Sequence, residues 1–183
     1  MTSSRIYGRP SDLPLPPDDP ARELTHVRLD DRALEHIHLA GGTYTVLISG
    51  KESNGQYCLF NFNVPPCAGP GHHRHDFEEM FHILEGEAEL HFRGKKTTVH
   101  AGEIVNIPAN APHFFRNVSD EKLRILCVCS PAGQEDFFRE MGTPAASRDE
   151  PAPKPTAEEM QALKEKAQRL GLVYRTEFLP PEK

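Results

Sequence analysis

A short segment of the chain carries side chains suited to binding a metal ion. His73 and His75 are separated by one residue, and Glu79 follows shortly after them. Residues two apart on an extended segment point to the same side, so both imidazoles can face one point. Neutral imidazole is the commonest metal ligand in proteins, and carboxylates bind many of the same divalent ions. Further along, His113 supplies a third imidazole, and the four residues together predict a site for one divalent metal ion.

A His-x-His pair alone is weak evidence for such a site, because histidines on a solvated loop can have the same spacing. His36 and His38 form a second pair, and no glutamate follows it at a similar interval. We interpret that second pair as having no role in metal binding. The first pair differs from it in the pattern of the residues around it.

That pattern resembles the two signature motifs of the cupin superfamily. The residues that match the first motif, G-x5-HxH-x3,4-E-x6-G, are His73, His75, Glu79 and Gly86. The residues that match the second motif, G-x5-PxG-x2-H-x3-N, are Gly102, Pro108, His113 and Asn117. The resemblance implies a cupin barrel that holds one divalent transition metal ion with the three histidines and the glutamate.

Two positions depart from the motifs. Cys67 stands where the first motif opens with glycine, although Gly69 and Gly71 are close by. Asn110 replaces the inner glycine of the second motif, and asparagine tolerates a left-handed backbone better than most residues. Neither position is a ligand, so the set that the resemblance implies is complete: His73, His75, Glu79 and His113.

The resemblance extends over about residues 40–180. Three further segments are similar to bacterial single-domain cupins often compared with quercetin 2,3-dioxygenase: GGTYTVLISGKESNG, SPAGQEDFFREMG and GLVYRTEFLPP. This implies a quercetinase-like dioxygenase that acts with O2 on a small aromatic or enolisable substrate. Cupins also include isomerases, cyclases, lyases and binding proteins. A non-oxidative metal enzyme and a non-catalytic ligand-binding protein therefore stay open as alternatives.

The ligand set does not choose among iron, manganese, nickel, cobalt and zinc, because mixed nitrogen and oxygen ligation suits all of them. Glu79 is also the candidate catalytic residue. It can remain a ligand that balances charge, or it can leave the metal and act as a general base, as the dioxygenase resemblance implies.

Phenylalanines are the candidate walls of a substrate pocket, which would favour a planar or apolar substrate. Phe81 and Phe115 each lie two residues from a ligand and are the strongest candidates. The other candidates are Phe60, Phe62 and Phe92, and ordinary core packing is the competing interpretation for them.

The rest of the sequence has the pattern of an all-β protein. Short runs rich in β-branched and aromatic residues recur between glycine turns, which is typical of a sandwich or barrel rather than of alternating β-α units. The expected strands are 34–39, 44–48, 57–64, 77–84, 87–92, 97–100, 104–108, 113–117 and 123–129. Together with this pattern, the resemblance to the cupin superfamily implies a double-stranded β-helix (cupin/jelly-roll barrel), and we expect it to carry an extended N-terminal arm and short C-terminal helices.

We expect the chain to be organised as an arm at residues 1–32, a barrel at 33–131 and a helical extension at 132–183 packed on the barrel. Prolines are clustered near the start of the chain. Because proline has no backbone N–H, the arm lacks the hydrogen-bond donors that a central strand needs. The segment 50–55 is expected to be a loop.

The helical extension is predicted to begin with a short helix at 134–141, which Gly142 ends. A linker rich in proline and alanine follows. Thr156 and Glu159 then form a capping box at the start of a second helix, with Gly171 at its C-terminal cap.

The composition limits the partners. The net charge of −6 argues against nucleic acid or an anionic membrane, both of which need a concentrated basic surface. No apolar run approaches the roughly 20 residues that span a membrane, and the first residues lack the apolar segment of a secretion signal. We therefore expect a cytoplasmic protein that acts on a small molecule, with its four cysteines as free thiols. We also expect the protein to be a homodimer.

Overall fold

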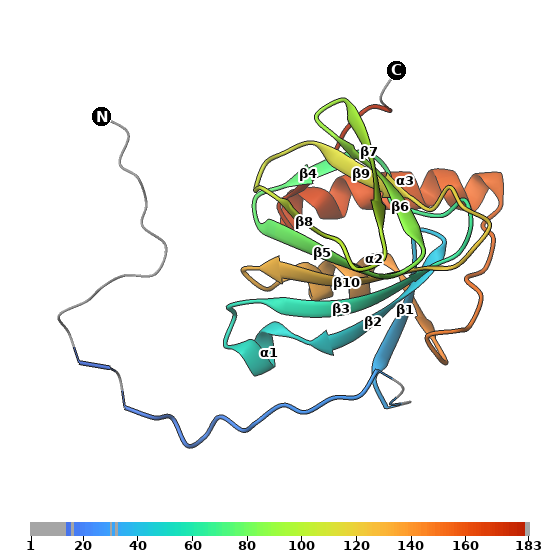
Figure 1. Cartoon of the computed structure of the whole chain (residues 1–183). Helices are drawn as coiled ribbons and strands as arrows, with labels where there is room; N and C mark the ends of the chain where they lie inside the picture. The colour runs from blue at the N-terminus through green and yellow to red at the C-terminus, as the bar shows by residue number, and fades with distance from the viewer. Residues whose placement is uncertain (1–13, 16, 30, 32, 182–183) are drawn as a thin grey trace, which may run out of the picture.

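The computed structural model describes residues 14–15, 17–29, 31 and 33–181. Most of it consists of two antiparallel sheets that face each other, with two helices behind them (Figure 1). Parts of the expected arm, residues 1–13, 16, 30 and 32, lie outside the described residues. The described part of the arm runs away from the sheets, and Leu15 and Leu24 in it are each 93% exposed.

The larger sheet has the strand order β11-β1-β2-β3-β10-β5-β8, and the smaller has the order β12-β4-β9-β6-β7. The strands are β1 (Glu35–Leu39), β2 (Gly42–Ile48), β3 (Cys58–Val64), β4 (His73–His75), β5 (Glu78–Glu85), β6 (Glu87–Phe92), β7 (Lys95–His100), β8 (Ile104–Ile107), β9 (His113–Arg116), β10 (Leu123–Ser130), β11 (Thr143–Ala145) and β12 (Thr176–Phe178). The helices are α1 (Gly50–Ser53), α2 (Gln134–Met141) and α3 (Ala157–Val173). The all-β double-stranded β-helix with short C-terminal helices is confirmed.

The alternation of side chains along each strand builds the core between the sheets. In β10 every second residue from Leu123 to Cys129 is fully buried, while the residues between them are half-buried. This is the two-residue period of a strand with one face turned inward. The expected strands all occur, with ends that differ by a few residues.

The core is rich in aromatic rings. The ring of Phe62 stacks on that of Tyr44, with 3.9 Å between ring centroids, and lies 5.9 Å from Phe138 of α2. Phe62 also meets Phe81 edge-on, and Phe81 meets Phe115 in the same way. Helix α2 therefore contributes directly to the interior, and these rings link it to both sheets.

Four short elements differ from the sequence prediction. The segment that bears His73 and His75 forms the strand β4, which is not among the expected strands. The linker contains β11, which pairs with β1, and the C-terminal tail contains β12, which pairs with β4. Strands of three residues carry too little alternation to be recognised. The expected loop at 50–55 contains α1, whose capping box joins Ser49 and Glu52, a Ser-x-x-Glu signal that was present in the sequence.

The two predicted C-terminal helices are confirmed, including the capping box of Thr156 and Glu159. The assignment of Gly171 as the C-terminal cap is wrong, because α3 continues to Val173 and is capped at Tyr174. A Cβ atom at Gly171 would lie 2.2 Å from the carbonyl oxygen of Thr176. Glycine is needed there because β12 packs closely against the helix.

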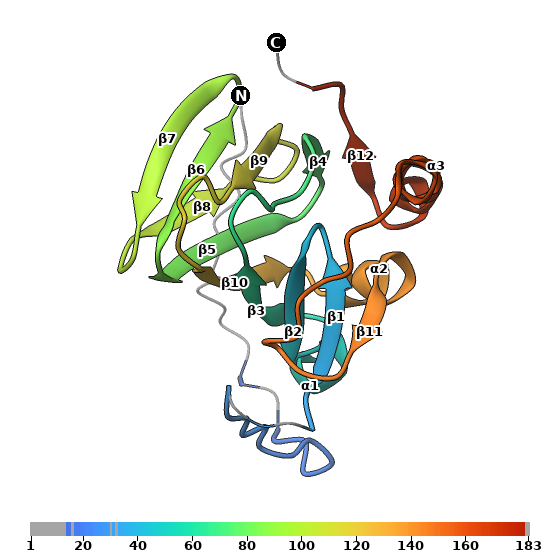
Figure 2. The same ribbon diagram turned by 90° about the vertical axis from the view of Figure 1, so that its right-hand side faces the viewer.

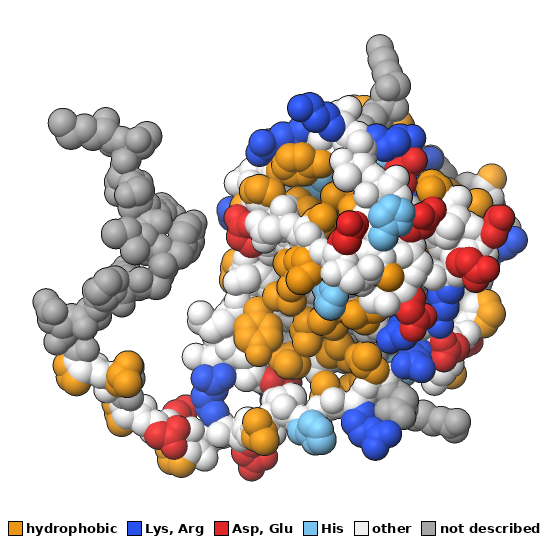
Figure 3. Space-filling model, viewed as in Figure 1, with side chains coloured by type: hydrophobic (Ala, Val, Ile, Leu, Met, Phe, Trp, Pro, Cys, Tyr) orange, Lys and Arg blue, Asp and Glu red, His pale blue; other side chains and the backbone are white. Residues whose placement is uncertain are grey.

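Apolar side chains gather on the outer face of the larger sheet (Figure 3). Ile104 is 62% exposed, and Leu59, Leu126 and Val128 are half-buried on the same face. The expected homodimer stays a prediction.

No described helix is long and apolar enough to cross a membrane.

Gly69 offers a test of the packing beside the first motif. Its φ is 144°, and a Cβ atom there would lie 2.3 Å from the carbonyl oxygen of Phe115. We expect Gly69→Ala to lower the free energy of unfolding by about 2 kcal/mol or more, because backbone strain and the clash add. Gly71 has open space around its Cβ position. In urea denaturation, the free energy of unfolding of Gly71→Ala should therefore stay within about 0.5 kcal/mol of that of the unchanged protein. Equal losses for the two variants would contradict the close approach of Gly69 to Phe115.

Candidate metal centre

Three imidazoles meet on neighbouring strands of the smaller sheet. His73 and His75 lie on β4, and His113 lies opposite His73 on β9. A nitrogen atom from each of the three rings lies within 4.8 Å of the others. His75 is 3% exposed and His113 is fully buried, whereas His73 is half-buried.

Glu79 reaches these rings from the larger sheet. It lies on β5, on the same inward face as Phe81 and Ile83, and is 6% exposed. Its Oε2 atom lies 3.3 Å from Nε2 of His75 and 3.1 Å from Nε2 of His113. The structure therefore brings together the four residues that the sequence singles out, in the space between the two sheets.

Backbone carbonyls fix the orientation of all three rings. In each ring, Nδ1 lies 2.8–3.0 Å from the carbonyl oxygen of a residue two positions away. The pairs are His73 with Gly71, His75 with Phe77, and His113 with Ala111. A carbonyl can only accept, so Nδ1 must donate, and in a neutral ring Nε2 then carries a lone pair. Such anchoring of the outer nitrogen is the usual arrangement of metal-binding histidines.

This arrangement places acceptors opposite acceptors. The ionised carboxylate of Glu79 and the unprotonated Nε2 atoms of His75 and His113 would repel one another unless a proton or a metal ion lay between them. Two ligand atoms, each about 2.1 Å from one metal ion, are separated by about 3.0–3.4 Å at octahedral or tetrahedral angles. The observed 3.1 and 3.3 Å agree with that separation. The donor set therefore fits a divalent metal ion.

The surroundings favour the protonation states that bind a metal. Burial works to raise the pKa of Glu79, but the hydrogen bonds that His113 and His75 donate when their Nε2 atoms are protonated outweigh it and hold the pKa well below its usual range. Burial lowers the pKa of His73 to about 3, and His113 adds to that shift. At neutral pH Glu79 is thus a carboxylate and His73 a neutral imidazole, the forms that coordinate metals. Burial opposes protonation of His113, but Glu79 outweighs it and raises the pKa of His113, so a proton competes with a metal there.

Two cysteines touch the far side of the carboxylate. The Sγ atoms of Cys127 and Cys129 on β10 lie 3.4 and 3.8 Å from Oε1 of Glu79. Burial raises the pKa of Cys127 to about 12, so the free thiol stays protonated and can donate to Oε1. Both cysteines are fully buried in the core. The sequence does not show that β10 pairs with β5 and sets Cys129 opposite Glu79.

Two aromatic rings that lie beside the histidines were not predicted from the sequence. The ring of Phe77 stacks on that of His75, with 3.8 Å between centroids. Phe178 of β12 lies opposite His73, and their ring centroids are 6.2 Å apart. Strand β12 runs beside β4, with α3 next to it (Figure 2). Phe77 shares the parity of His75 and could have been found, whereas nothing local connects Phe178 to the site.

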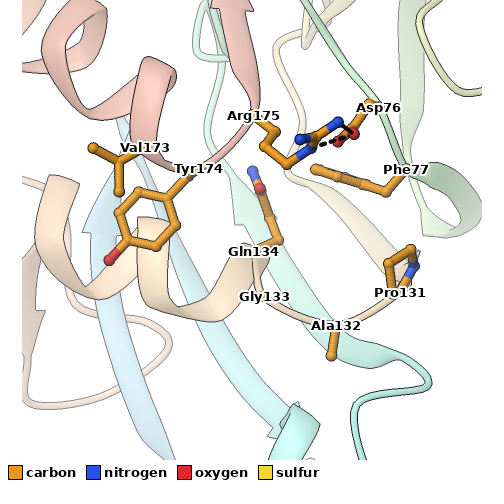
Figure 4. Close-up of a pocket in the computed structure, with 9 residues that line it drawn as sticks. All are labelled: Asp76, Phe77, Pro131, Ala132, Gly133, Gln134, Val173, Tyr174 and Arg175. Carbon is orange, nitrogen blue, oxygen red and sulfur yellow. Dashed lines mark hydrogen bonds and ion pairs between the residues drawn. The ribbon is translucent and has the colours of Figure 1, made fainter.

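Phe77 also lines a pocket of about 250 Å³ near the C-terminal end of α3 (Figure 4). The side chain of Gln134 lies among its lining residues, beneath the ion pair of Arg175 and Asp76. One phenylalanine ring therefore touches both this pocket and the ring of His75.

The predicted pocket walls are mostly core. Four of them are at most 3% exposed and pack within the aromatic core: Phe60, Phe62, Phe81 and Phe115. Phe92 is half-buried on β6, with the guanidinium of Arg93 over its ring at 4.9 Å. Contact of these residues with a substrate stays a prediction.

The other histidine pair has separate partners. Nδ1 of His36 lies 2.8 Å from the hydroxyl of Thr45, and Nδ1 of His38 lies 3.2 Å from that of Thr43. Both side chains are nonetheless buried, at 6% and 9% exposure. They belong to β1, which is the second strand of the larger sheet.

Both motif departures stand in left-handed backbone. Cys67 has φ of 64° and Asn110 has φ of 68°. The substitution at Asn110 agrees with the tolerance of asparagine for this conformation, whereas cysteine is less suited to it. The thiol of Cys67 is exposed, and all four cysteines are free.

Comparison with known proteins places these features in a family. The cupin domain matches residues 60–129. Quercetin 2,3-dioxygenase of Bacillus subtilis (strain 168) is 26% identical over 102 residues, which are 55% of this chain and 30% of that protein. The oxalate-binding protein of Thermotoga maritima is 30% identical over 84 residues, which are 45% of this chain and 69% of that protein.

A solved structure agrees with the sequence matches. The polyketide cyclase RemF from Streptomyces resistomycificus has a TM-score of 0.52 and 26% identity, over 59% of this chain and 80% of that one. These proteins carry different names for what they do, and the chain spans less than a third of the dioxygenase. The first two are similar to this chain in sequence, and RemF is similar to it in fold as well. With its paired sheets, its two signature motifs and these similarities, the chain belongs to the cupin superfamily.

Proposed function

We propose that the chain is a metal-dependent dioxygenase of the quercetinase-like type, which acts with O2 on a small aromatic or enolisable substrate. The observation that carries the proposal is the donor set: three carbonyl-anchored imidazoles whose ligand atoms lie within 4.8 Å of one another, with an ionised carboxylate against two of them. The similarity to quercetin 2,3-dioxygenase supports this reaction over others, although the chain spans 30% of that protein.

In this proposal His73, His75, His113 and Glu79 hold one divalent ion. The ion, when bound, supplies a Lewis acid for a substrate hydroxyl and a means of using O2. Residues that do not bind the ion hold the four ligands in position. Backbone carbonyls orient the three rings, and the thiols of Cys127 and Cys129 contact Oε1 of Glu79.

Glu79 has two roles open to it. As a ligand it offers Oε2 and balances the charge of the ion. As a base it accepts the hydroxyl proton of the substrate at that same atom. The contacts of Oε1 with two thiols hold the carboxylate in place, which favours the role of a ligand.

A second candidate is a non-oxidative metal enzyme, such as a cyclase, that uses the same four residues. The similarity to RemF, which covers 80% of that cyclase, favours it. A non-catalytic protein is the third candidate, supported by the similarity to the oxalate-binding protein.

Oxygen consumption separates these candidates. Protein loaded in turn with iron, manganese, nickel, cobalt or zinc would be mixed with flavonols and catechols in an oxygen electrode. The dioxygenase proposal predicts O2 uptake that matches substrate loss and no turnover under strict anaerobiosis. Product formed without O2 would replace it with the non-oxidative enzyme, and ligand binding without product would replace it with the binding protein.

A further inference from the structure

The two carboxylate oxygens of Glu79 contact different groups, and only one of them lies beside the imidazoles. Oε2 faces His75 and His113, whereas Oε1 faces the thiols of Cys127 and Cys129. We propose that Glu79, Cys127 and Cys129 form a second metal site, suited to a thiophilic divalent cation such as Zn²⁺ or Cd²⁺. It shares Glu79 with the imidazole site but does not depend on the reaction proposed above.

The distances among the three ligand atoms support this proposal. For bonds of about 2.3 Å to sulfur and 2.1 Å to oxygen, tetrahedral coordination separates two sulfurs by about 3.8 Å and a sulfur from an oxygen by about 3.6 Å. The two Sγ atoms lie 3.8 Å apart, and they lie 3.4 and 3.8 Å from Oε1. All three edges of this triangle agree with one face of a tetrahedron to within about 0.2 Å, the tolerance expected of a metal site.

The strand geometry produces this triangle without distortion. Cys127 and Cys129 are two residues apart on β10, so both side chains point to the same side of the sheet. Cys129 lies directly opposite Glu79 on β5. The ladder between these two strands therefore sets the thiols and the carboxylate side by side.

Charge balance also favours a divalent ion. When the cation binds, each thiol releases its proton to solvent, and two thiolates neutralise the charge of the cation. Neutrality matters because all three side chains are buried and an uncompensated charge there is costly. The carboxylate of Glu79 would then bridge the two ions. The soft thiolates select thiophilic metals, whereas the imidazoles and the carboxylate accept harder ones.

The chain contains its own controls. Cys58 is a third buried thiol in the same core, but its Sγ faces the carbonyl of Cys129 at 3.9 Å and lies outside the group that shares Glu79. Cys67 is exposed and would bind thiophilic ions adventitiously. Cys67→Ser is therefore the background for every protein compared.

The experiment is a titration of the metal-free, reduced Cys67→Ser protein with Cd²⁺ and with Co²⁺. The readouts are the thiolate-to-metal charge-transfer absorption in the ultraviolet and the stoichiometry from equilibrium dialysis. We expect the absorption to reach its maximum when the thiol site is filled, and dialysis to give one more ion per chain than in the variant that also carries Cys127→Ser and Cys129→Ser. Adding Cys58→Ser or His113→Ala should preserve the band. Adding Cys127→Ser with Cys129→Ser should abolish it, and adding Cys127→Ala alone should weaken it because one thiolate remains.

Far-ultraviolet circular dichroism checks that every variant folds. Mn²⁺ binding is a second check for the cysteine variants only, because Mn²⁺ prefers nitrogen and oxygen ligands and His113→Ala removes one of them. The proposal is overturned if the folded Cys67→Ser protein shows no charge-transfer band, or if the band survives the paired serine changes. A band that survives His113→Ala, in a protein that shows no dioxygenase activity, would leave the thiol site standing while the proposed function fails.

Discussion

Replacing His113 by alanine is expected to lower the affinity for the metal ion of the imidazole site by more than about 100-fold. Changing a group that only orients a ligand already costs 10–100-fold, and His113 is proposed as a ligand itself. Its ring is fully buried, with Nδ1 anchored to Ala111 and Nε2 turned to Glu79. Equilibrium dialysis against Mn²⁺ with elemental analysis measures the loss.

His36→Ala is the matched control, because His36 is also buried but bonds to Thr45 in β2. It should leave the stoichiometry of Mn²⁺ unchanged. If His113→Ala bound Mn²⁺ as tightly as the unchanged protein, the imidazole site would be wrong. If both variants lost the metal equally, the loss would reflect a damaged fold.

Replacing Phe62 by alanine is expected to lower the free energy of unfolding by about 3–5 kcal/mol, as for other large-to-small changes of a buried aromatic residue. Phe62 is 2% exposed and its ring stacks on Tyr44. It also contacts Phe138 of α2 and Phe81 of β5, which ties the helix to the larger sheet. The cavity left behind would loosen all three contacts. Urea denaturation, followed by circular dichroism, measures the change.

Phe92→Ala is the control for this experiment. Phe92 is half-buried on β6, and one of its ring faces meets Arg93. Its loss should cost less than half as much as that of Phe62. Similar costs for the two changes would mean that the aromatic core contributes no more than an ordinary surface contact.

The residues of the candidate metal centre could be named from the sequence because two motifs resemble those of the cupin superfamily, and the side on which three of them lie follows from a local pattern. His73, His75 and Glu79 lie within one short segment, and the two-residue period of a strand turns Glu79 to the same side as Phe81. Cys127 and Cys129 follow the same period in β10, and both are fully buried. Wherever one face of a strand is apolar, the direction of each side chain follows from the sequence alone.

Contacts between distant strands could not be predicted in this way. The thiols meet Glu79 only because β10 pairs with β5, and no residue in either strand specifies that neighbour. The same holds for Phe178 beside His73. Gly171 was misassigned because a glycine near the end of a helix usually caps it, whereas here the position serves a strand that packs on the helix from outside.

The pairing of β12 with β4 has a consequence for how the chain folds. Arg74 and Glu177, which join these two strands, are 103 positions apart. Closing so long a loop costs entropy before any contact is gained, and ladders of this kind form late and slowly. While the protein is being synthesised, the strand that bears His73 and His75 therefore keeps an unpaired edge until residues near 178 have left the ribosome. An open edge is a template for pairing with other chains, so the nascent barrel is open to such pairing at the strand that carries two of its proposed ligands.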